Sequence, residues 1–416
     1  PLVLELLGTR CAFTICEDLW ESGPIRQAKS AGAQLAVNIN ASPFHINKLV
    51  ERKELLSKRC KQAGFPILYV NLIGGQDELV FDGGSMAANA KGECCFLAPS
   101  YVEGLYSLEI LVSQDGRIEI PHKSIANDLD LEVDVYQSLV LGVRDYVNKN
   151  KFKGVVLGLS GGIDSALTLA IAVDALGSDR VQAVMMPFEF TSQLSLDVAA
   201  KQAEKLGVNY QVIAINEIYH SFIDALSDEF AGTTVDVSEQ NIQARARGVL
   251  LMAISNKQGL LVLTTGNKSE IAVGYSTLYG DMAGGFDVLK DVSKTLVYKL
   301  ANYRNNSFLQ QREEIIPQLV IDRAPSAELA PNQVDQDSLP DYEVLDQILE
   351  LYIEKDRSAE DIIEHGFAED IVRRILRLVD LNEYKRRQSP VGVRLTERGF
   401  GRDRRYPITN AWLIGE

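Results

Sequence analysis

Residues 157–177 read LGLSGGIDSALTLAIAVDALG, and this stretch determines how the rest of the chain is interpreted. An apolar run leads into a turn of glycine and serine, and residues 164–176 then repeat apolar side chains at helical spacing. A turn between a strand and a helix presents main-chain N–H groups at the positive end of the helix. Glycine permits the positive φ angles and the close backbone approach that an anion requires. The stretch therefore predicts a phosphate-binding turn.

Strands and helices alternate on both sides of this turn. The expected strands cover residues 154–160, 181–187, 210–215 and 260–266, and helices are expected at 164–176, at 193–206 and up to about residue 257. The strands are continuous apolar runs, which is typical of parallel strands buried on both faces. The pattern predicts an α/β fold with a doubly wound parallel sheet. Such sheets bind ligands at the carboxyl ends of their strands.

The glycine turn contains no lysine, which separates it from two familiar phosphate-binding loops. G-x-x-x-x-G-K-[ST] requires a lysine after its glycine, and G-x-G-x-x-G requires a third glycine that this turn does not supply. A nest of amides and hydroxyls without lysine suits a pyrophosphate that departs as one unit. Asp164 follows the glycines and is a candidate magnesium ligand, and Glu270 after the strand at 260–266 supplies a second carboxylate.

The composition excludes several classes of function. A chain of 416 residues is expected to form two domains, and its hydrophobic fraction of 46% and charged fraction of 24% are ordinary for globular proteins. No apolar run is long enough to cross a bilayer, and a net charge of −15 disfavours nucleic acid as a partner. The five cysteines show no zinc spacing and no secretory leader precedes them, so we expect a cytoplasmic protein. The four histidines form no recognisable cluster.

The chain divides near residue 130, so we expect one domain at 1–130 and a second at 131–416. The first part alternates short β-rich runs, among them 11–15, 33–40, 65–73 and 108–120, with one helix at 46–64. It therefore looks like a partial α/β domain. Residues 323–343 are rich in Pro, Asp and Gln and could form a mobile lid before a helical tail at about 341–388.

The string S-G-G-x-D-S resembles the signature of the ATP pyrophosphatase family, whose members cleave ATP to AMP and pyrophosphate. The stretches 241–248, 261–301, 323–329 and 383–390 look like those of NAD synthetases, and the likeness covers residues 131–416. The resemblance implies an adenine nucleotide alpha hydrolase-like fold. It also implies that the nicotinate carboxylate of deamido-NAD is adenylated by ATP and then amidated by ammonia.

The same resemblance implies roles for individual residues. Contacts with ATP would be made by Gly158, Leu159, Ser160, Gly161, Gly162, Ile163, Asp164, Ser165, Thr265, Lys294 and Ser326. Magnesium would be bound by Asp164 and Glu270. Contacts with deamido-NAD would be made by Asn241, Arg245, Glu270, Asp287 and Lys385. The glycine-rich stretch 280–287 leaves open whether Asp281 or Asp287 is the substrate contact.

The front part contains ICEDLW at 15–20, NINASPFHINK at 38–48 and YVNLIGGQDELVFDGGS at 69–85. These resemble the nitrilase-like glutaminase domain of glutamine-dependent NAD synthetases. The resemblance implies that Cys16 is the nucleophile that takes the acyl group of glutamine as a thioester. It also implies that Glu17, Ser42 and Lys48 bind glutamine.

The nitrilase triad also needs a glutamate and a lysine that precede the cysteine by many tens of residues, and only 15 residues precede Cys16. A thiol without its base is a poor nucleophile near neutral pH. We therefore expect that the sequence is part of a longer protein, truncated at its N-terminus, or else that this half does not hydrolyse glutamine. The complete protein would use glutamine, and the chain as given would need free ammonium.

Other functions remain open at this point. The chain could be another amidotransferase of the same nucleotide-binding type, such as a GMP or asparagine synthetase, although the nitrilase-like front half disfavours this. It could be a non-catalytic nucleotide-binding module, or a nitrilase joined to an unrelated ATPase. The expected partners are small-molecule substrates, with no nucleic acid and no membrane, and the resemblance implies a homo-oligomer.

Overall fold

The computed structural model describes residues 2–306, 314–326, 328–330, 335–337 and 339–409. Contacts between Cα atoms divide the chain into two compact units, Pro1–Leu141 and Gly142–Glu416. The division falls inside helix α3 (Leu131–Lys149), whereas the sequence analysis places the boundary before this helix. Each unit has its own sheet and its own buried core.

The second unit is built on a five-stranded sheet in the order β13-β12-β11-β14-β15. Every neighbouring pair of strands in this sheet is parallel. The strands are β11 (Val155–Gly158), β12 (Val181–Met185), β13 (Asn209–Val212), β14 (Leu261–Thr264) and β15 (Phe286–Asp287). Strands β12 and β14 are buried along their whole length, as expected for apolar runs covered on both faces. The predicted doubly wound sheet is confirmed.

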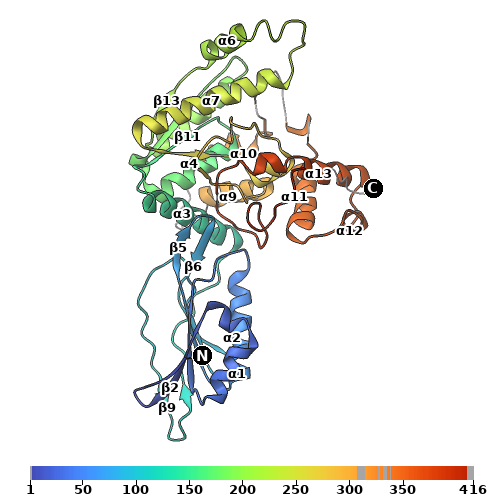
Figure 1. Ribbon diagram of the computed structural model, residues 1–416. Coiled ribbons are helices and arrows are strands. Elements are labelled where there is room, and N and C mark those ends of the chain that lie inside the picture. Colours follow the sequence, from blue (N-terminus) through green and yellow to red (C-terminus); the bar gives the residue numbers. More distant parts are fainter. Residues whose placement is uncertain (1, 307–313, 327, 331–334, 338, 410–416) are drawn as a thin grey trace. The chain divides into compact units, whose positions relative to one another are not determined.

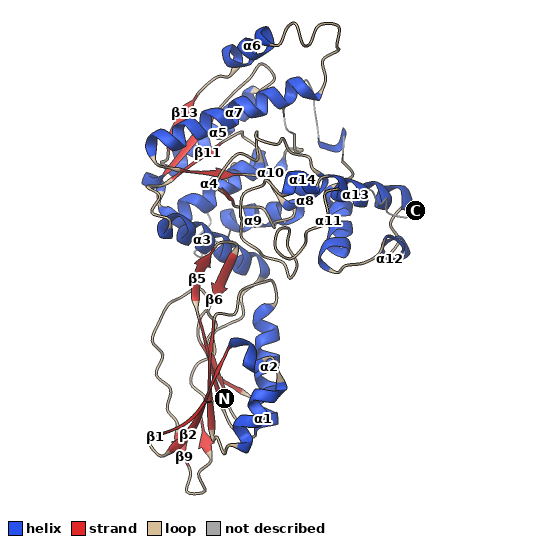
Figure 2. Cartoon of the chain, viewed as in Figure 1, coloured by secondary structure: helices blue, strands red, loops and turns tan. Residues whose placement is uncertain are grey.

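Helices cover both faces of this sheet (Figures 1 and 2). Helix α7 packs on β11 and β14 beside α6, and α4 packs on the opposite face with α5 and α9 as neighbours. Their bounds are α4 (Ile163–Leu176), α5 (Gln193–Leu206), α6 (Asn216–Ala225), α7 (Val237–Gln258) and α9 (Lys294–Asn306). Helix α4 follows the glycine turn and ends at Gly177, whose φ of +81° an L side chain rarely adopts.

The strand order changes direction between β11 and β14. From β11 the chain continues to β12 on one side, and it returns to β14 on the other side of β11. The loops after these two strands therefore diverge and leave a crevice at the carboxyl edge of the sheet. The glycine turn follows β11, and residues 265–270 follow β14, so the topology places the two predicted carboxylates on opposite sides of this crevice.

Most of the remaining helices of the second unit pack in a separate apolar cluster around Leu345, Ile348, Ile375 and Leu376, whereas α10 packs on α4 and α9. They are α8 (Lys268–Val273), α10 (Gln318–Asp322), α11 (Tyr342–Leu349) continued by a π-helical turn (Glu350–Glu354), α12 (Ala359–Glu364), α13 (Glu369–Leu381) and α14 (Glu383–Arg386). The predicted helical tail is thus several short helices. Asp356 and Gly366 have positive φ and interrupt it.

The first unit contains a mixed six-stranded sheet in the order β1-β2-β3-β4-β7-β8. The strands are β1 (Leu2–Leu6), β2 (Thr9–Ile15), β3 (Leu35–Asn40), β4 (Ile67–Asn71), β7 (Met86–Ala88) and β8 (Cys94–Leu97). Strands β2, β3 and β4 are parallel to one another, and the other pairs are antiparallel. Helices α1 (Ser22–Ser30) and α2 (Lys48–Ala63) bury Ile25, Leu56 and Cys60 against this sheet.

Two short hairpins complete the first unit. One pairs β5 (Ile73–Gln76) with β6 (Leu79–Asp82), and the other pairs β9 (Leu111–Val112) with β10 (Ile118–Glu119). The β-rich run expected at 108–120 is therefore mostly a tight turn. Ser113 and Gly116 close it, because the Gly116 N–H donates to the Ser113 carbonyl. Within the described residues, no helix is long and apolar enough to cross a membrane.

Candidate active site

The glycine turn adopts a conformation that only glycine tolerates. Gly161 has φ +83°, and a Cβ built on it would lie 2.6 Å from the carbonyl oxygen of Ser195. The turn is braced by hydroxyls, because the Ser160 N–H donates to Ser165 Oγ at 3.2 Å and the Gly162 N–H donates to Ser160 Oγ at 3.2 Å. The first turn of α4 follows directly and presents its N–H groups without carbonyl partners from the helix. The arrangement suits an anion.

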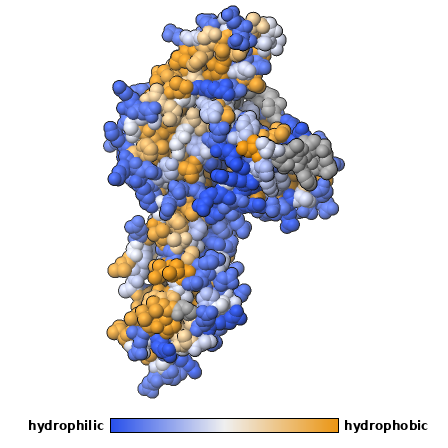
Figure 3. Space-filling model, viewed as in Figure 1, coloured by the Kyte–Doolittle hydropathy of each residue, from blue (hydrophilic) through white to orange (hydrophobic). Residues whose placement is uncertain are grey.

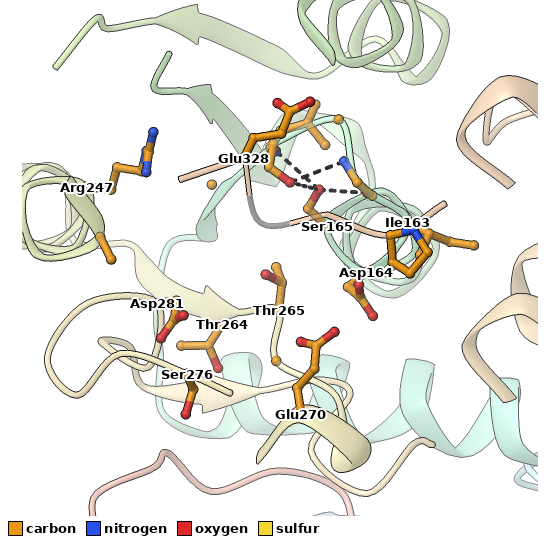
Figure 4. A pocket seen from close by; sticks show the side chains of 18 of the residues that line it. Ile163, Asp164, Ser165, Arg247, Thr264, Thr265, Glu270, Ser276, Asp281 and Glu328 are labelled. Atoms are coloured by element: carbon orange, nitrogen blue, oxygen red, sulfur yellow. Dashed lines mark hydrogen bonds between the residues drawn. The ribbon is translucent and has the colours of Figure 1, made fainter. Parts of the chain in front are cut away.

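One cavity brings most of the predicted residues together (Figure 4). The predicted ligand residues that line it are Gly158, Leu159, Ser160, Gly161, Gly162, Ile163, Asp164, Ser165, Thr265, Glu270, Asp287, Lys294 and Ser326. They come from the ends of β11, β14 and β15, from α4, α8 and α9, and from the segment after α10. Residues more than 160 positions apart in sequence therefore share one cavity at the carboxyl edge of the sheet.

Asp164 and Glu270 share one cation within this cavity. The Lys294 ammonium lies 2.6 Å from Asp164 Oδ2 and 2.9 Å from Glu270 Oε1, and its residue is only 2% exposed. Burial raises the pKa of the Glu270 carboxyl to about 7, although Lys294 acts in the opposite direction. Burial alone would lower the pKa of Lys294, but the two carboxylates outweigh it and keep the ammonium charged.

The carboxylate pair has the chemistry of a magnesium site. Hard carboxylate oxygens are what Mg²⁺ prefers, and it usually keeps further phosphate or water ligands. Asp164 and Glu270 already hold a single positive charge, that of Lys294, between them. No group of three or more His, Cys, Asp or Glu residues arranged for a metal occurs in the described part of the chain, so the protein alone offers an incomplete shell. The residues therefore fit an ion that also binds a substrate's phosphates.

Three further predicted residues lie around the loop that follows α8. Thr277 Oγ1 donates to Asn241 Oδ1 at 2.9 Å, and Arg245 Nε donates to the Leu278 carbonyl at 3.2 Å. Lys385 Nζ donates to the carbonyl oxygens of Gly274 and Ser276 at 2.7 and 2.8 Å. Asn241, Arg245 and Lys385 are outside the lining of the cavity, but the loop that they contact contributes Tyr275 and Ser276 to it. The structure thus gathers them beside the cavity.

The two competing aspartates both line the cavity. Asp287 is 2% exposed, and its Oδ1 has no hydrogen-bond partner among the described atoms. Burial raises the pKa of Asp287 to about 7, with Lys290 acting in the opposite direction. Asp281 is exposed and accepts the Thr277 N–H at 2.8 Å. The choice between the two stays open.

Several residues of the cavity were missed by the sequence analysis. Arg247 is half-buried and donates through Nε to the Met186 carbonyl at 3.0 Å, and burial lowers its pKa to about 10. Glu328 accepts from the hydroxyls of Ser192 and Ser195, both at 2.9 Å, and also from Arg323. Arg247 follows Arg245 by two residues, and Arg323 and Glu328 fall within the RAPSAEL stretch. These residues therefore lie in stretches that resemble the family, but the sequence predicted no role for them.

In the first unit, Cys16 lies in a strained turn directly after β2. Its φ is +40°, which is uncommon for a residue other than glycine and is frequent at functional positions. Asp18 Oδ2 accepts the Ile15 N–H at 2.9 Å and thereby fixes this turn. Glu17 is exposed and Cys16 is half-buried. Within the described residues, no carboxylate or ammonium forms a hydrogen bond with the thiol.

Ser42 and Lys48 follow β3, the strand that pairs with β2. Ser42 is buried, and Arg52 holds it by donating to its Oγ at 3.1 Å and to its carbonyl at 2.8 Å. Arg52 is itself fully buried against Asp82. Lys48 Nζ lies 2.8 Å from Glu51 and 4.0 Å from the centre of the Trp20 ring. The predicted glutamine contacts therefore occupy the same edge of the sheet as Cys16.

The fold and the cavity define a protein of the NAD synthase class. The family model described as NAD synthase matches residues 135–389. The chain belongs to the glutamine-dependent NAD(+) synthetase family. It is 51% identical over 411 residues to the glutamine-dependent NAD(+) synthetase of Acinetobacter baylyi, and the match covers 99% of this chain and 75% of that protein.

Similar solved structures include a member of this family and a shorter synthetase that matches part of the chain. The glutamine-dependent NAD+ synthetase of Acinetobacter baumannii, solved in complex with adenosine diphosphate, is 48% identical with a TM-score of 0.73, and covers 100% of this chain and 75% of that one. The NMN synthetase of Francisella tularensis is 26% identical with a TM-score of 0.52, and covers 62% of this chain and 96% of that one. The sequence-based identification of the family is confirmed.

Proposed function

We propose that the protein catalyses the ATP-dependent amidation of deamido-NAD to NAD, with release of AMP and pyrophosphate. It is a carbon–nitrogen ligase whose amido donor is glutamine or free ammonium. The observation that carries the proposal is the shared cavity, which is lined by the lysine-free glycine turn together with Asp164 and Glu270. Figure 4 shows the two carboxylates in this cavity. Membership of the glutamine-dependent NAD(+) synthetase family supports the same reaction.

The phosphates of ATP would lie on the glycine turn, with Thr265 and Ser326 as further contacts. Main-chain N–H groups at the start of α4 carry partial positive charge, and they are already oriented before the nucleotide arrives. Asp164 and Glu270 would hold Mg²⁺, which when bound would neutralise charge on the phosphate oxygens. Lys294 would supply a further positive charge close to the same phosphates.

The first step is attack of the nicotinate carboxylate oxygen on the α-phosphorus of ATP. A new P–O bond forms, the bond from the α-phosphorus to the bridging oxygen breaks, and pyrophosphate leaves with the electron pair. Donors aimed at the departing charge stabilise this step, because they do not need to reorient during the reaction. The amides around Gly161 and the Lys294 ammonium are such donors.

The second step is attack of ammonia on the acyl carbon of the adenylate. AMP leaves, and the nitrogen loses one proton to give the amide. Asp287 offers an unpartnered oxygen in the cavity and a pKa of about 7, so near neutral pH it can accept a hydrogen bond from a ribose or from ammonia. Water must be excluded, since it would return the starting acid. Residues 323–326, with Glu328 and Leu329, line one part of the cavity and are suited to this role.

The substrate's pyrophosphate and ribose would contact Asn241, Arg245 and Lys385 beside the cavity. Two cations in this region match a substrate that carries two phosphates and a carboxylate.

Helix α7 also presents Val249 and Met252 to solvent, and Phe222 of α6 is exposed nearby in the same layer. Figure 3 shows apolar surface where α6 and α7 lie. We propose that this face joins two copies in a homo-oligomer.

Glutamine would be the nitrogen source through Cys16. Its thiolate would attack the side-chain amide carbon, forming a thioester and releasing ammonia, with Glu17, Ser42 and Lys48 binding the rest of glutamine. The strained backbone at Cys16 supports a nucleophile held at the end of its strand. A location in the cytoplasm stays a prediction of the sequence.

The test supplies ATP, magnesium and deamido-NAD with either ammonium or glutamine and follows NAD formation. NAD is expected from ammonium at a rate that depends strictly on deamido-NAD. Nicotinate mononucleotide, xanthosine monophosphate and aspartate, offered in its place, are expected to give product at less than about a hundredth of that rate. Preferred use of xanthosine monophosphate or aspartate would identify a GMP or asparagine synthetase instead. Nucleotide binding without turnover would identify a binding module.

A further inference from the structure

Asn267 lies between the Asp164 carboxylate and the backbone of Glu270, and it has no role in the reaction described so far. We propose that Asn267 is a positioning residue that holds Asp164 in the orientation needed to bind a divalent cation together with Glu270. This inference rests on the proposed function, because it concerns how the same cavity takes up metal and ATP. It requires that one side chain holds the Asp164 carboxylate at a fixed place relative to the backbone of Glu270.

The contacts of Asn267 connect the Asp164 carboxylate directly to the backbone of Glu270. Its Nδ2 donates to Asp164 Oδ1 at 2.9 Å, across 103 positions in the sequence. Its Oδ1 accepts the main-chain N–H of Glu270 at 3.0 Å and thereby caps the start of α8. The Asn267 side chain is fully buried, so neither contact is exchanged with solvent. The two arms of one amide thus fix Asp164 relative to the backbone of Glu270.

The hydrogen-bond donors to the two carboxylates show why the contact between Asn267 and Asp164 matters. Asp164 Oδ2 accepts from Lys294, and Glu270 Oε1 also accepts from Lys294. Lys294 therefore occupies the space between the carboxylates that a metal ion would share. Asn267 contacts Asp164 through the other oxygen, Oδ1, so its hold on Asp164 does not depend on where the Lys294 ammonium lies. Figure 4 shows Asp164 and Glu270 facing the same part of the cavity.

Asn267 stands on a rigid base. The next residue, Lys268, is buried and pairs with Asp291 at 2.8 Å and Glu354 at 2.6 Å. Ser269 donates to Asp346 and accepts the Lys294 N–H at 2.9 Å. The start of α8 is therefore tied to its neighbours at three successive positions. A side chain on such a base can hold its partner within a few tenths of an ångström, which is what a metal ligand requires.

Asparagine is suited to this position because its side chain both donates and accepts. Serine and aspartate can keep the acceptor that caps α8, but serine is too short to reach Asp164 and ionised aspartate has no donor. Asn267→Ser and Asn267→Asp therefore separate the contact with Asp164 from the cap. Loss of partners that orient metal ligands typically costs about tenfold to a hundredfold in metal affinity.

The experiment titrates Mn²⁺ into the full chain in the presence of ATP and measures the free ion by electron paramagnetic resonance. Asn267→Ser is expected to raise the Kd for Mn²⁺ at least about tenfold, while ATP binding without metal changes less than about threefold. The magnesium concentration for half-maximal NAD synthesis should rise by the same factor. Asn305→Ser is the matched control, because Asn305 is also buried and bonds the main chain of Ile315 and Ile316 away from the carboxylates.

Asn305→Ser is expected to lower the melting temperature and leave the Kd for Mn²⁺ unchanged. The inference is overturned if the folded Asn267→Ser variant binds Mn²⁺ with the affinity of the wild type. It is also overturned if Asn267→Ser lowers the affinity of the Asp164→Asn variant by the same factor as that of the wild type, because in that variant Asn267 has no carboxylate to orient. Failure of the wild-type chain to bind Mn²⁺ with ATP would instead contradict the proposed function.

Discussion

The cavity of the second unit and the thiol turn of the first unit are marked by equally short motifs, but they differ in how much of a site each contains. Around the glycine turn, thirteen predicted residues line one cavity, and the carboxylates there are already paired with Lys294. Around Cys16 the backbone is strained and Ser42 is fixed, yet no described carboxylate or ammonium bonds the thiol. An anion site can be built from consecutive main-chain amides, whereas an activated nucleophile needs partners from distant parts of a chain.

Of the substitutions considered, Asp164→Asn should impair the cavity of the second unit most severely. The substitution removes the charge that pairs with Lys294 and leaves Glu270 as the only carboxylate of the pair. NAD synthesis from ammonium is expected to fall about a thousandfold, which corresponds to about 4 kcal/mol of transition-state stabilisation. Asp174→Asn is the control, since Asp174 is on the same helix as Asp164 but pairs with Arg304 of α9, and its loss should lower stability without such a loss of activity. Equal losses in the two variants would contradict the account.

Gly161→Ala tests whether the turn itself, and not only its carboxylate, forms the site. The added methyl group would meet the Ser195 carbonyl at 2.6 Å, and the residue would keep a φ of +83°. We expect a fall in kcat/KM of about a hundredfold, or about 2.7 kcal/mol. Gly177→Ala is a close control, because its φ is +81° but nothing lies within 4 Å of the added atom. That variant should lose about 1 kcal/mol of stability and retain its activity.

Asp287→Asn tests whether a carboxyl of the cavity is buried, because burial makes the free energy of unfolding depend on pH. The folded protein holds a proton on Asp287 up to about pH 7, whereas the unfolded chain releases it near the ordinary value of 3.8. The unfolded state therefore binds fewer protons in this window, and Asp287 costs stability as pH rises from about 4 to 7. The stability of the variant relative to the wild type should increase by about 4 kcal/mol between pH 4 and pH 8, as measured by urea unfolding. A difference that stays constant with pH would contradict the burial of this carboxyl.

Lys385→Ala should have the smallest effect. Lys385 contacts the loop carbonyls of Gly274 and Ser276 and lies outside the lining of the cavity. If it binds the substrate's phosphates equally in the ground and transition states, KM for deamido-NAD should rise about tenfold with kcat unchanged, a difference of about 1.4 kcal/mol. The KM for ATP should stay within about twofold. A fall in kcat alone would place Lys385 in the chemical step instead.

Much of this site follows from the sequence because its parts lie at the ends of strongly patterned strands. The alternation from 154 to 266 predicts a parallel sheet, and the sheet then brings Asp164 and Glu270 to one edge. Membership of the family and the fold class are confirmed. The residue roles and the domain boundary stay predictions.

Other features could not be predicted, for physical reasons. Asn267 and Glu328 act through partners that are 103 and more than 130 positions away, and no local pattern indicates such contacts. Strand β15 is only two residues long, so periodicity does not reveal it, and its place beside β14 is what buries Asp287. The run at 108–120 is apolar enough to suggest a strand, but a tight turn at 113–116 divides it.

The nucleotide products test the central claim most directly. With ATP, magnesium, deamido-NAD and ammonium, phosphorus NMR should show AMP and pyrophosphate appearing in equal amounts with NAD. That result is expected if the lysine-free turn holds the two outer phosphates as they leave together. ADP and orthophosphate as the products would contradict it.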